Sequence, residues 1–171
     1  MNAALQLFAS KGFANTSISL IAKKAGISKG LMYNYFTGKD DLLNAIFEQG
    51  FSKMFDMFDL DGDGVLTKQE FIYFIDESFN LMDQERDFFK LYFAVMMQPS
   101  VWKKFKFSIN DIVQPLLQLL ENYYAKKGVN NPELEAVLVG ALLDGIGFNF
   151  VYNPDLYPLE DIKKLVIERF V

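Results

Sequence analysis

Apolar and polar positions along this chain follow the period of an α-helix almost from end to end. Apolar residues recur three or four positions apart, and no stretch bounded by turns shows the every-second-residue alternation that marks a half-buried strand. Glycine, serine and proline residues divide the pattern into segments, because they cap or interrupt helices. The segments predict helices at about residues 2–11, 17–25, 29–36, 37–58, 68–80, 84–97, 101–126, 132–152 and 158–171. We therefore expect an all-α fold.

Composition narrows the possible functions. Of all residues, 51% are apolar and 16% are aromatic, which supplies a core and leaves apolar side chains for a pocket or an interface. The chain contains neither Cys nor His, so it lacks the residues of a disulfide framework, a thiolate zinc site and the commonest general base. No nucleophile–base constellation is visible in the sequence. We therefore expect no catalytic residues and no enzyme.

The expected location is the cytoplasm, without a membrane partner. The start of the chain, MNAALQLFASKG, has no basic segment ahead of an apolar run, as a secretory signal would have. The longest apolar stretch, Ala136–Tyr152, is interrupted by Asp144 and Asn149 and is expected to be too short and too polar to span a membrane. The absence of Cys fits a reducing compartment.

The net charge of −5 conceals an uneven distribution along the chain. Residues 1–53 carry six lysines against three acidic residues, whereas residues 54–87 carry ten acidic residues against one lysine and one arginine. Residues 88–171 carry nine charges of each sign. The basic part and the acidic part therefore predict different binding partners, a polyanion for the first and a cation for the second.

Residues 18–36, ISLIAKKAGISKGLMYNYF, have the features of a helix-turn-helix. Ala22 is small where two helices approach each other closely, and Gly26 suits the left-handed backbone of a tight turn. Ser28 is placed to cap the second helix, whose first turn would then point Lys29 at DNA. The segment therefore predicts a reader of double-stranded DNA.

The stretch LFASKGFANTSISLIAKKAGISKGLMYNYFTGKDDLLNAIF closely resembles the DNA-binding domain of the TetR family of transcriptional regulators, with a match from residue 3 to about residue 47. Its pattern SKGxxYxYFxxKxxL is highly specific. The resemblance implies a homodimer that binds a palindromic operator. It also implies phosphate contacts from Ser17, Lys29, Tyr33 and Lys39, with Ser28 opening the recognition helix and with Gly30, Leu31 and Asn34 near base edges.

Two departures from the family pattern concern the start of this domain. Leu20 stands where family members usually carry an acidic residue, so the reciprocal bond of a capping box with Ser17 is unavailable. The chain also begins inside the first helix, which we expect to be truncated at its N-terminal end. Within the motif, we expect the aromatic side chains of Tyr35 and Phe36 to lie in the core.

Residues 59–70, DLDGDGVLTKQE, match the EF-hand loop at every constrained position, including Gly64 at the sharp bend. Hard oxygen ligands in a flexible ring favour calcium over the smaller and more strongly hydrated magnesium. The predicted ligands are the side chains of Asp59, Asp61, Asp63 and Glu70, the carbonyl of Val65, and Thr67 through a water molecule.

The alternative is an acidic, solvated connection between helices that only resembles the motif. Four carboxylates in one short loop repel each other unless a cation compensates them, which favours the calcium site. EF-hands normally work in pairs, and the sequence holds no second loop. We therefore expect one calcium ion per chain, with a structural role rather than a signalling role.

The C-terminal part, rich in bulky apolar residues, resembles the effector-binding and dimerisation region of the family. An aromatic stripe at helical spacing is usually core, but Met and aromatic side chains also suit an adaptable pocket for a small molecule. The candidates for such an effector pocket are Phe89, Tyr92, Phe93, Met96, Trp102, Leu116, Leu120 and Tyr123. The candidates for the dimer interface, on the last two helices, are Leu138, Leu142, Ile162 and Val166.

These observations predict two domains and one function. Residues 1–47 form the DNA-binding domain, and residues 48–171 form the effector-binding and dimerisation domain that contains the loop 59–70. The expected function is that of a repressor released from its operator by a small apolar effector. The alternative is a calcium-sensing interaction protein with a vestigial DNA-binding module, which would bind a protein partner when calcium is added.

Overall fold

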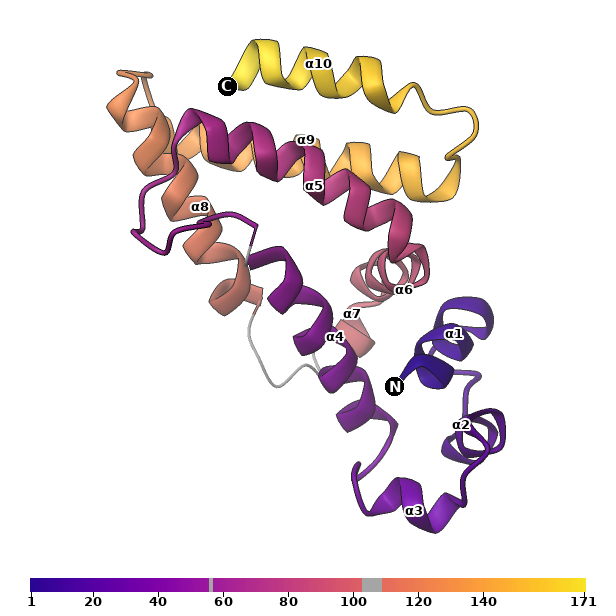
Figure 1. Ribbon diagram of the computed structural model, residues 1–171. Helices are drawn as coiled ribbons and strands as arrows, with labels where there is room; N and C mark the ends of the chain where they lie inside the picture. The colour runs from indigo at the N-terminus through magenta and orange to yellow at the C-terminus, as the bar shows by residue number, and fades with distance from the viewer. Residues whose placement is uncertain (56, 103–108) are drawn as a thin grey trace. The chain divides into compact units, whose positions relative to one another are not determined.

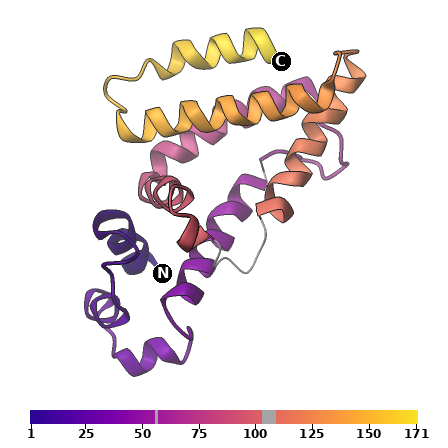
Figure 2. The same cartoon turned by 180° about the vertical axis from the view of Figure 1, so that it is seen from behind.

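A computed structural model describes residues 1–55, 57–102 and 109–171, and every regular element in this described part is a helix (Figures 1 and 2). The predicted all-α fold is therefore confirmed. The helices are α1 (Asn2–Lys11), α2 (Ile18–Ala25), α3 (Lys29–Tyr33), α4 (Lys39–Phe55), α5 (Lys68–Gln84), α6 (Arg86–Met96), α7 (Pro99–Trp102), α8 (Ile109–Lys126), α9 (Pro132–Tyr152) and α10 (Leu159–Phe170).

The helix predicted over residues 68–80 continues to Gln84, and the one predicted over 37–58 spans Lys39–Phe55; two further helices differ more. The recognition helix α3 ends at Tyr33 rather than at residue 36, because the amide groups of Tyr35 and Phe36 both donate to the carbonyl of Met32 and close the chain into a turn. The single helix expected over residues 101–126 is divided into α7 and α8, and residues 103–108 between them lie outside the described residues.

The chain divides into two compact units. The first unit comprises Met1–Phe51 and Glu85–Lys106, and the second comprises Ser52–Gln84 and Phe107–Val171. Glu85–Lys106 therefore belongs to the same unit as the N-terminal helices, and α1 packs against α6. A division of the sequence by motif, at residue 47, leaves this segment with the C-terminal part.

Aromatic rings fill the space between α4 and α6 within the first unit. The ring centroid of Phe47 lies 5.5 Å from that of Phe88, and Phe51 lies 5.5 Å from Tyr92. The ring of Phe88 rests against the backbone of α4 at Gly50, where an added Cβ would overlap the ring. Gly50 is therefore needed for this close approach of the two helices.

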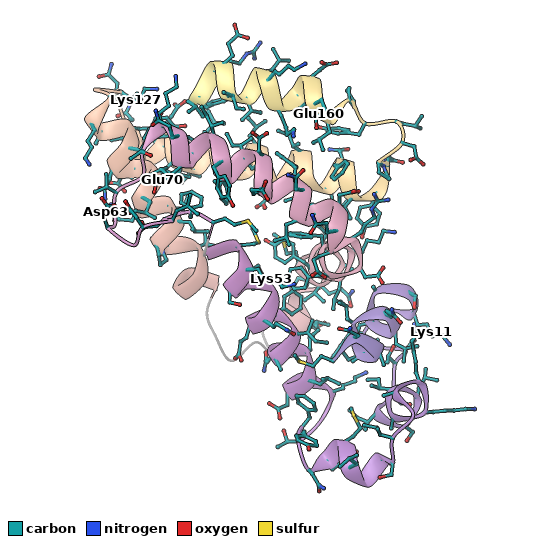
Figure 3. The ribbon with its side chains drawn as sticks, viewed as in Figure 1. Lys11, Lys53, Asp63, Glu70, Lys127 and Glu160 are labelled. Carbon is teal, nitrogen blue, oxygen red and sulfur yellow. The ribbon has the colours of Figure 1, made fainter. Side chains whose placement is uncertain are left out.

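An ion pair between a buried lysine and a partly exposed aspartate joins α5 to α10 in the second unit, where α5 also packs against α9. Lys163 is 8% exposed, and its Nζ lies 3.2 Å from Asp76 and 2.9 Å from Glu160. Burial alone would lower the pKa of Lys163, but hydrogen bonds to Glu160 and Asp76 raise it. The lysine therefore stays charged and fixes α10 to α5; Glu160 is labelled in Figure 3.

The last residues of the chain are fastened to the end of α8. Nζ of Lys127 and the hydroxyl of Tyr123 donate to the carbonyl of Val171 at 2.7 and 2.8 Å, and the hydroxyl of Tyr124 donates to that of Phe170 at 2.9 Å (Lys127 is labelled in Figure 3). Burial, and secondarily the negative charge of Glu135, raises the pKa of Tyr124. The hydroxyl therefore remains a donor well above neutral pH.

Helix α9 is apolar on two sides. It has 21 residues and is long and apolar enough to cross a membrane by length and composition, so the expectation that this segment is too short was wrong. One side packs into the second unit and consists of Ala136, Val139, Ile146, Gly147, Phe150 and Val151. The other side, which we call the α9 stripe, is exposed and consists of Leu134, Val137, Leu138, Ala141, Phe148 and Tyr152.

Candidate DNA-reading surface and calcium loop

Two serine caps shape the helix-turn-helix. The Oγ of Ser17 accepts a hydrogen bond from the amide of Leu20 at 3.2 Å, and the Oγ of Ser28 accepts one from Leu31 at 3.0 Å. Both predicted caps are therefore confirmed. Between the helices, Gly26 adopts the left-handed conformation with φ of 69°, as the turn requires.

The capped start of α3 carries most of the residues expected to contact DNA. Met32 is the side chain of this segment that turns into the core, at 6% exposure. Nζ of Lys29 lies 5.8 Å from the ring centroid of Tyr33, so the two side chains lie next to each other on the helix surface. The exposed residues, which we call the reading surface, are Ser28, Lys29, Gly30, Leu31, Tyr33 and Asn34.

Tyr35 adds to this surface and contradicts the expectation that it belongs to the core. Its side chain is 73% exposed, whereas Phe36 is half-buried. The reason is the early end of α3: the periodicity that would have placed Tyr35 inward stops at Tyr33. The sequence signal for this end is weak, since neither glycine nor proline follows the helix until Gly38.

Lys39 occupies a different place from the phosphate contact expected for it. Its Nζ donates to the carbonyls of Phe13 at 2.7 Å, Ala14 at 3.1 Å and Thr16 at 3.1 Å. The ammonium also lies 4.5 Å from the ring centroid of Phe13. A lysine has three N–H donors, and all three are used inside the domain. Lys39 therefore fastens the turn between α1 and α2 to the start of α4.

The acidic loop between α4 and α5 brings three of its carboxylates together. One oxygen atom from each of Asp59, Asp61 and Asp63 lies within 4.8 Å of the other two. Backbone amides hold this arrangement: Gly64 donates to Asp59 at 2.9 Å, and Val65 donates to Asp63 at 2.7 Å. The three side chains present oxygen ligands of the kind that calcium prefers.

Glu70 is tied to the first turn of α5 and lies outside this group of three (Asp63 and Glu70 are labelled in Figure 3). Its carboxylate accepts the amide of Thr67 at 2.8 Å, while the Thr67 hydroxyl accepts the amide of Glu70 at 3.2 Å. This reciprocal pair is a capping box. Glu70 is 8% exposed. Val65, the predicted carbonyl ligand, is half-buried in the loop.

The residues predicted for an effector pocket fall into both units. In the first unit, Phe89 and Phe93 are buried on α6, Tyr92 is half-buried and Met96 is 38% exposed. In the second unit, α8 carries the half-buried Leu116 and the buried Leu120 and Tyr123. The side chain of Trp102 lies outside the described residues.

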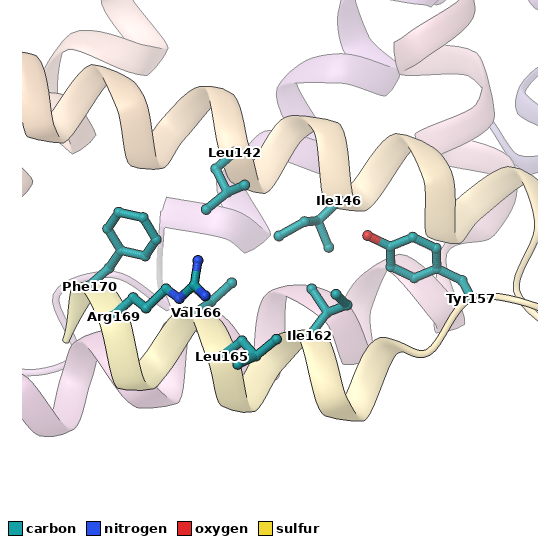
Figure 4. Close-up of a pocket in the computed structure, with 8 residues that line it drawn as sticks. All are labelled: Leu142, Ile146, Tyr157, Ile162, Leu165, Val166, Arg169 and Phe170. Atoms are coloured by element: carbon teal, nitrogen blue, oxygen red, sulfur yellow. The ribbon is translucent and has the colours of Figure 1, made fainter.

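The residues predicted for a dimer interface separate into two sets. Leu138 belongs to the exposed α9 stripe, at 54% exposure. Leu142, Ile162 and Val166 instead line a crevice between α9 and α10 of the same chain. Val166 is only 4% exposed within the single chain, because it lies on the side of α10 that faces α9 (Figure 4). One apolar face on each helix signals burial, but the pattern does not distinguish a partner helix from the neighbouring helix.

Comparisons with known proteins agree with this geometry. A family model described as "Bacterial regulatory proteins, tetR family" matches residues 1–46, and the EF hand domain model matches residues 50–76. The chain is 23% identical over 180 residues to the fatty acid metabolism regulator protein of Bacillus subtilis (strain 168), with 100% of this chain and 91% of that protein covered.

Solved structures extend the likeness to the whole fold. The fatty acid degradation regulator FadR from Bacillus halodurans has a TM-score of 0.77 at 22% identity, covering 98% of this chain and 89% of that one. FadR from Bacillus subtilis in complex with stearoyl-CoA has a TM-score of 0.76 at 22% identity, covering 99% and 95%.

A capped helix-turn-helix at the head of an all-α chain defines the class, a DNA-binding transcriptional regulator. Residues 1–46 match the model of the TetR family of these regulators, and over its whole length the chain is similar in fold to the FadR regulators. It carries in addition an EF-hand sequence, whose cluster of three aspartates is compatible with calcium binding.

Proposed function

We propose that this protein is a homodimeric repressor that leaves a palindromic operator when a small, largely apolar effector binds. The observation that carries the proposal is the reading surface, where Lys29, Asn34 and their neighbours are exposed on a helix whose first turn is capped by Ser28. Lys offers a mobile charge to phosphate, and the amide of Asn pairs with base edges. The six lysines of residues 1–53 add the positive field that duplex DNA requires.

Fluorescence anisotropy with operator duplexes chosen by selection from random DNA tests the DNA-binding part. Lys29→Ala should weaken binding to all sequences and flatten the salt dependence by about one unit of slope. Asn34→Ala should instead relax discrimination at one base pair, by roughly 1–3 kcal/mol. Lys126→Ala, which removes an exposed cation from α8, is the matched control and should change neither quantity. Unchanged binding by both reading-surface variants would refute the proposed surface.

The proposed dimer uses the α9 stripe, because an apolar surface of this length is unusual on a soluble monomer. Leu138→Glu places a charge in the stripe and should give a folded monomer in sedimentation experiments. Val166→Ala, on the inner side of α10, should instead lower the stability by about 1–3 kcal/mol and leave the dimer intact. A Leu138→Glu protein that remains dimeric would overturn this choice of surface.

The effector class follows from the apolar character of the chain and from the relative solved with stearoyl-CoA. Acyl-CoA compounds of different chain length are therefore the first candidates, and release of a bound operator duplex by one of them is the expected result. The ligand would favour a form of the dimer in which the two recognition helices no longer match successive major grooves. Binding of a protein partner that depends on calcium, without binding of duplex DNA, would support the alternative function as a calcium sensor.

The proposed calcium ion is structural and binds once per chain in residues 59–70. Asp59, Asp61 and Asp63 would hold it, with the Val65 carbonyl and with Glu70 turned from its capping position; Thr67 would act through water. Isothermal calorimetry at millimolar calcium should give one site per chain. Glu70→Gln should weaken the site, and Glu77→Gln, an exposed acid farther along α5, should not. Absence of calcium heat from the wild-type protein would refute the site.

A further inference from the structure

Gly30 stands in the first turn of α3, where neither the backbone nor the packing requires a glycine. It is not among the glycines with positive φ, and an added Cβ would meet the Oγ of Ser28 at 3.9 Å, which is an ordinary contact. Within a helix, glycine is less favourable than alanine. The use of a glycine at this position therefore points outside the chain, because a helix without a Cβ there can bring its backbone close to a partner.

The side chains of α3 divide into a face toward the core and a face toward solvent. Met32 turns into the core at 6% exposure. At about 100° per residue, Gly30 and Asn34 lie nearly opposite Met32, and Leu31 lies beside Asn34. Asn34 keeps the helical conformation, with φ of −71° and ψ of −22°, so this spacing extends to it. Leu31 is 40% exposed, which leaves an aliphatic side chain next to an amide on the face opposite the core.

These two side chains differ from those that commonly read guanine. Arginine and lysine pair with the O6 and N7 atoms of guanine, but residues 1–53 contain no arginine and Lys29 is the only cation in residues 28–34. Lys29 lies on the other flank of α3, with its Nζ 5.8 Å from the ring centroid of Tyr33. An amide pairs with adenine, and an apolar side chain contacts the methyl group of thymine. The solvent face of α3 therefore suits A·T base pairs.

We propose that Leu31 is a specificity-determining residue that contacts the 5-methyl group of a thymine, while Asn34 pairs with a nearby adenine. The inference rests on the proposed function and adds the bases that the protein selects. Side chains three positions apart on a helix have Cβ atoms about 5–6 Å apart, and successive base pairs are about 3.4 Å apart. The thymine therefore lies one or two base pairs from the adenine. Gly30 lets both side chains reach the base edges, because it allows the helix a close approach to the groove.

Replacement of thymine by uracil tests the contact without changing the protein, because uracil differs from thymine only in lacking the methyl group. Operator duplexes selected from random DNA would carry deoxyuridine in place of one thymidine at a time, with affinities measured by fluorescence anisotropy. At one thymine of each half-site, the replacement should weaken wild-type binding about fourfold, the factor for one buried methyl-sized group. In Leu31→Ala the same replacement should have no effect, because the side chain of alanine is too short to reach the methyl group.

Ile27→Ala is the matched control, because Ile27 is also aliphatic, lies just before α3 and is 37% exposed. This variant and Asn34→Ala should both keep the uracil effect. Asn34→Ala should instead become insensitive to 7-deazaadenine, which lacks N7, at the adenine that Asn34 reads. The proposal is overturned if no uracil weakens wild-type binding, if the effect persists in Leu31→Ala or disappears in Ile27→Ala, or if selected operators place G·C pairs at these positions. Each of these results leaves DNA binding intact, whereas failure to select any duplex would refute the proposed function and this inference with it.

Discussion

Two short connections in this protein gather oxygen atoms around a point, and they differ in the source of the positive charge. The turn between α1 and α2 directs the carbonyls of Phe13, Ala14 and Thr16 at the ammonium of Lys39. The loop between α4 and α5 gathers the carboxylates of Asp59, Asp61 and Asp63, which carry a full negative charge each.

The comparison shows two solutions to one electrostatic requirement. Neutral carbonyl dipoles need only one cation, and the chain supplies it as a side chain 23 to 26 residues away. Three converging carboxylates repel each other, and a compact divalent cation would compensate them more fully than one side chain could. The turn is therefore complete within the chain, whereas we propose that an ion from solution stabilises the loop further. Removing the ammonium of Lys39, or withholding calcium from the loop, tests the two cases separately.

The largest effect is expected from Lys39→Met, which keeps the aliphatic stem and removes the ammonium. Three carbonyls lose a charged donor, and the free energy of unfolding should fall by about 2–4 kcal/mol in urea titrations. The salt dependence of DNA binding should keep its slope, because Lys39 acts inside the domain. Lys29→Met is the matched control, with the slope reduced by about one and stability changed by less than about 0.5 kcal/mol. If Lys39→Met instead reduced the salt slope and left the stability unchanged, Lys39 would be a phosphate contact.

A comparable effect is expected from calcium on the acidic loop. An ion that binds only the folded chain should raise the free energy of unfolding by about 2.7 kcal/mol at a hundred times the dissociation constant. Calcium acts at the loop and not at Lys39. It should therefore raise the free energy of unfolding of Lys39→Met by the same amount as that of the wild type and should not restore the loss caused by the substitution. Thermal unfolding with calcium or with chelator measures both proteins, and an unfolding temperature insensitive to calcium would contradict the comparison.

A smaller effect is expected from Thr67→Val, which has nearly the same shape and lacks the hydroxyl. The amide of Glu70 loses its acceptor, and loss of a helix cap costs about 1 kcal/mol. The loss should appear already in chelator, because the cap belongs to the start of α5, and it should be larger in calcium, where Thr67 would also act on the ion through water. A loss seen only in calcium would instead make Thr67 chiefly an ion ligand.

The smallest effect, and the most diagnostic in sign, is expected from Asp61→Asn. The amide oxygen can still accept the backbone amide of Asp63, which lies 3.2 Å from Asp61 in the wild type. Removing one of three like charges should raise stability in chelator by a few tenths of a kcal/mol, roughly the size seen for exposed charges. In calcium the same change should lower stability, since a ligand is lost. Equal signs in both conditions would show that no ion occupies the loop.

Local chemistry explains which features the sequence predicts. The caps by Ser17 and Ser28 involve bonds to residues three positions away, so both helix starts follow from the sequence. The aspartates of the loop are likewise close in sequence and converge through bonds to nearby amides.

Features that depend on partners far away in the sequence could not be predicted from it. The sequence predicts an exposed side chain for Lys39, but its ammonium donates to carbonyls of a turn 23 to 26 residues earlier. Val166 has the same apolar pattern whether its helix covers α9 or a second chain, and only the fold decides that it lies inside. Tyr35 was placed in the core by a periodicity that continues past the observed end of α3.

The contact between Gly50 and Phe88 has a consequence for how this sequence can drift during evolution. The ring of Phe88 lies where any side chain at position 50 would begin, so a change at either position alters what the other tolerates. A helix former such as Ala is favoured over Gly in a helix, and selection for helix stability would push position 50 toward it. Homologous sequences with Ala or Ser at position 50 should therefore carry a residue smaller than Phe at position 88, as a covarying pair 38 positions apart.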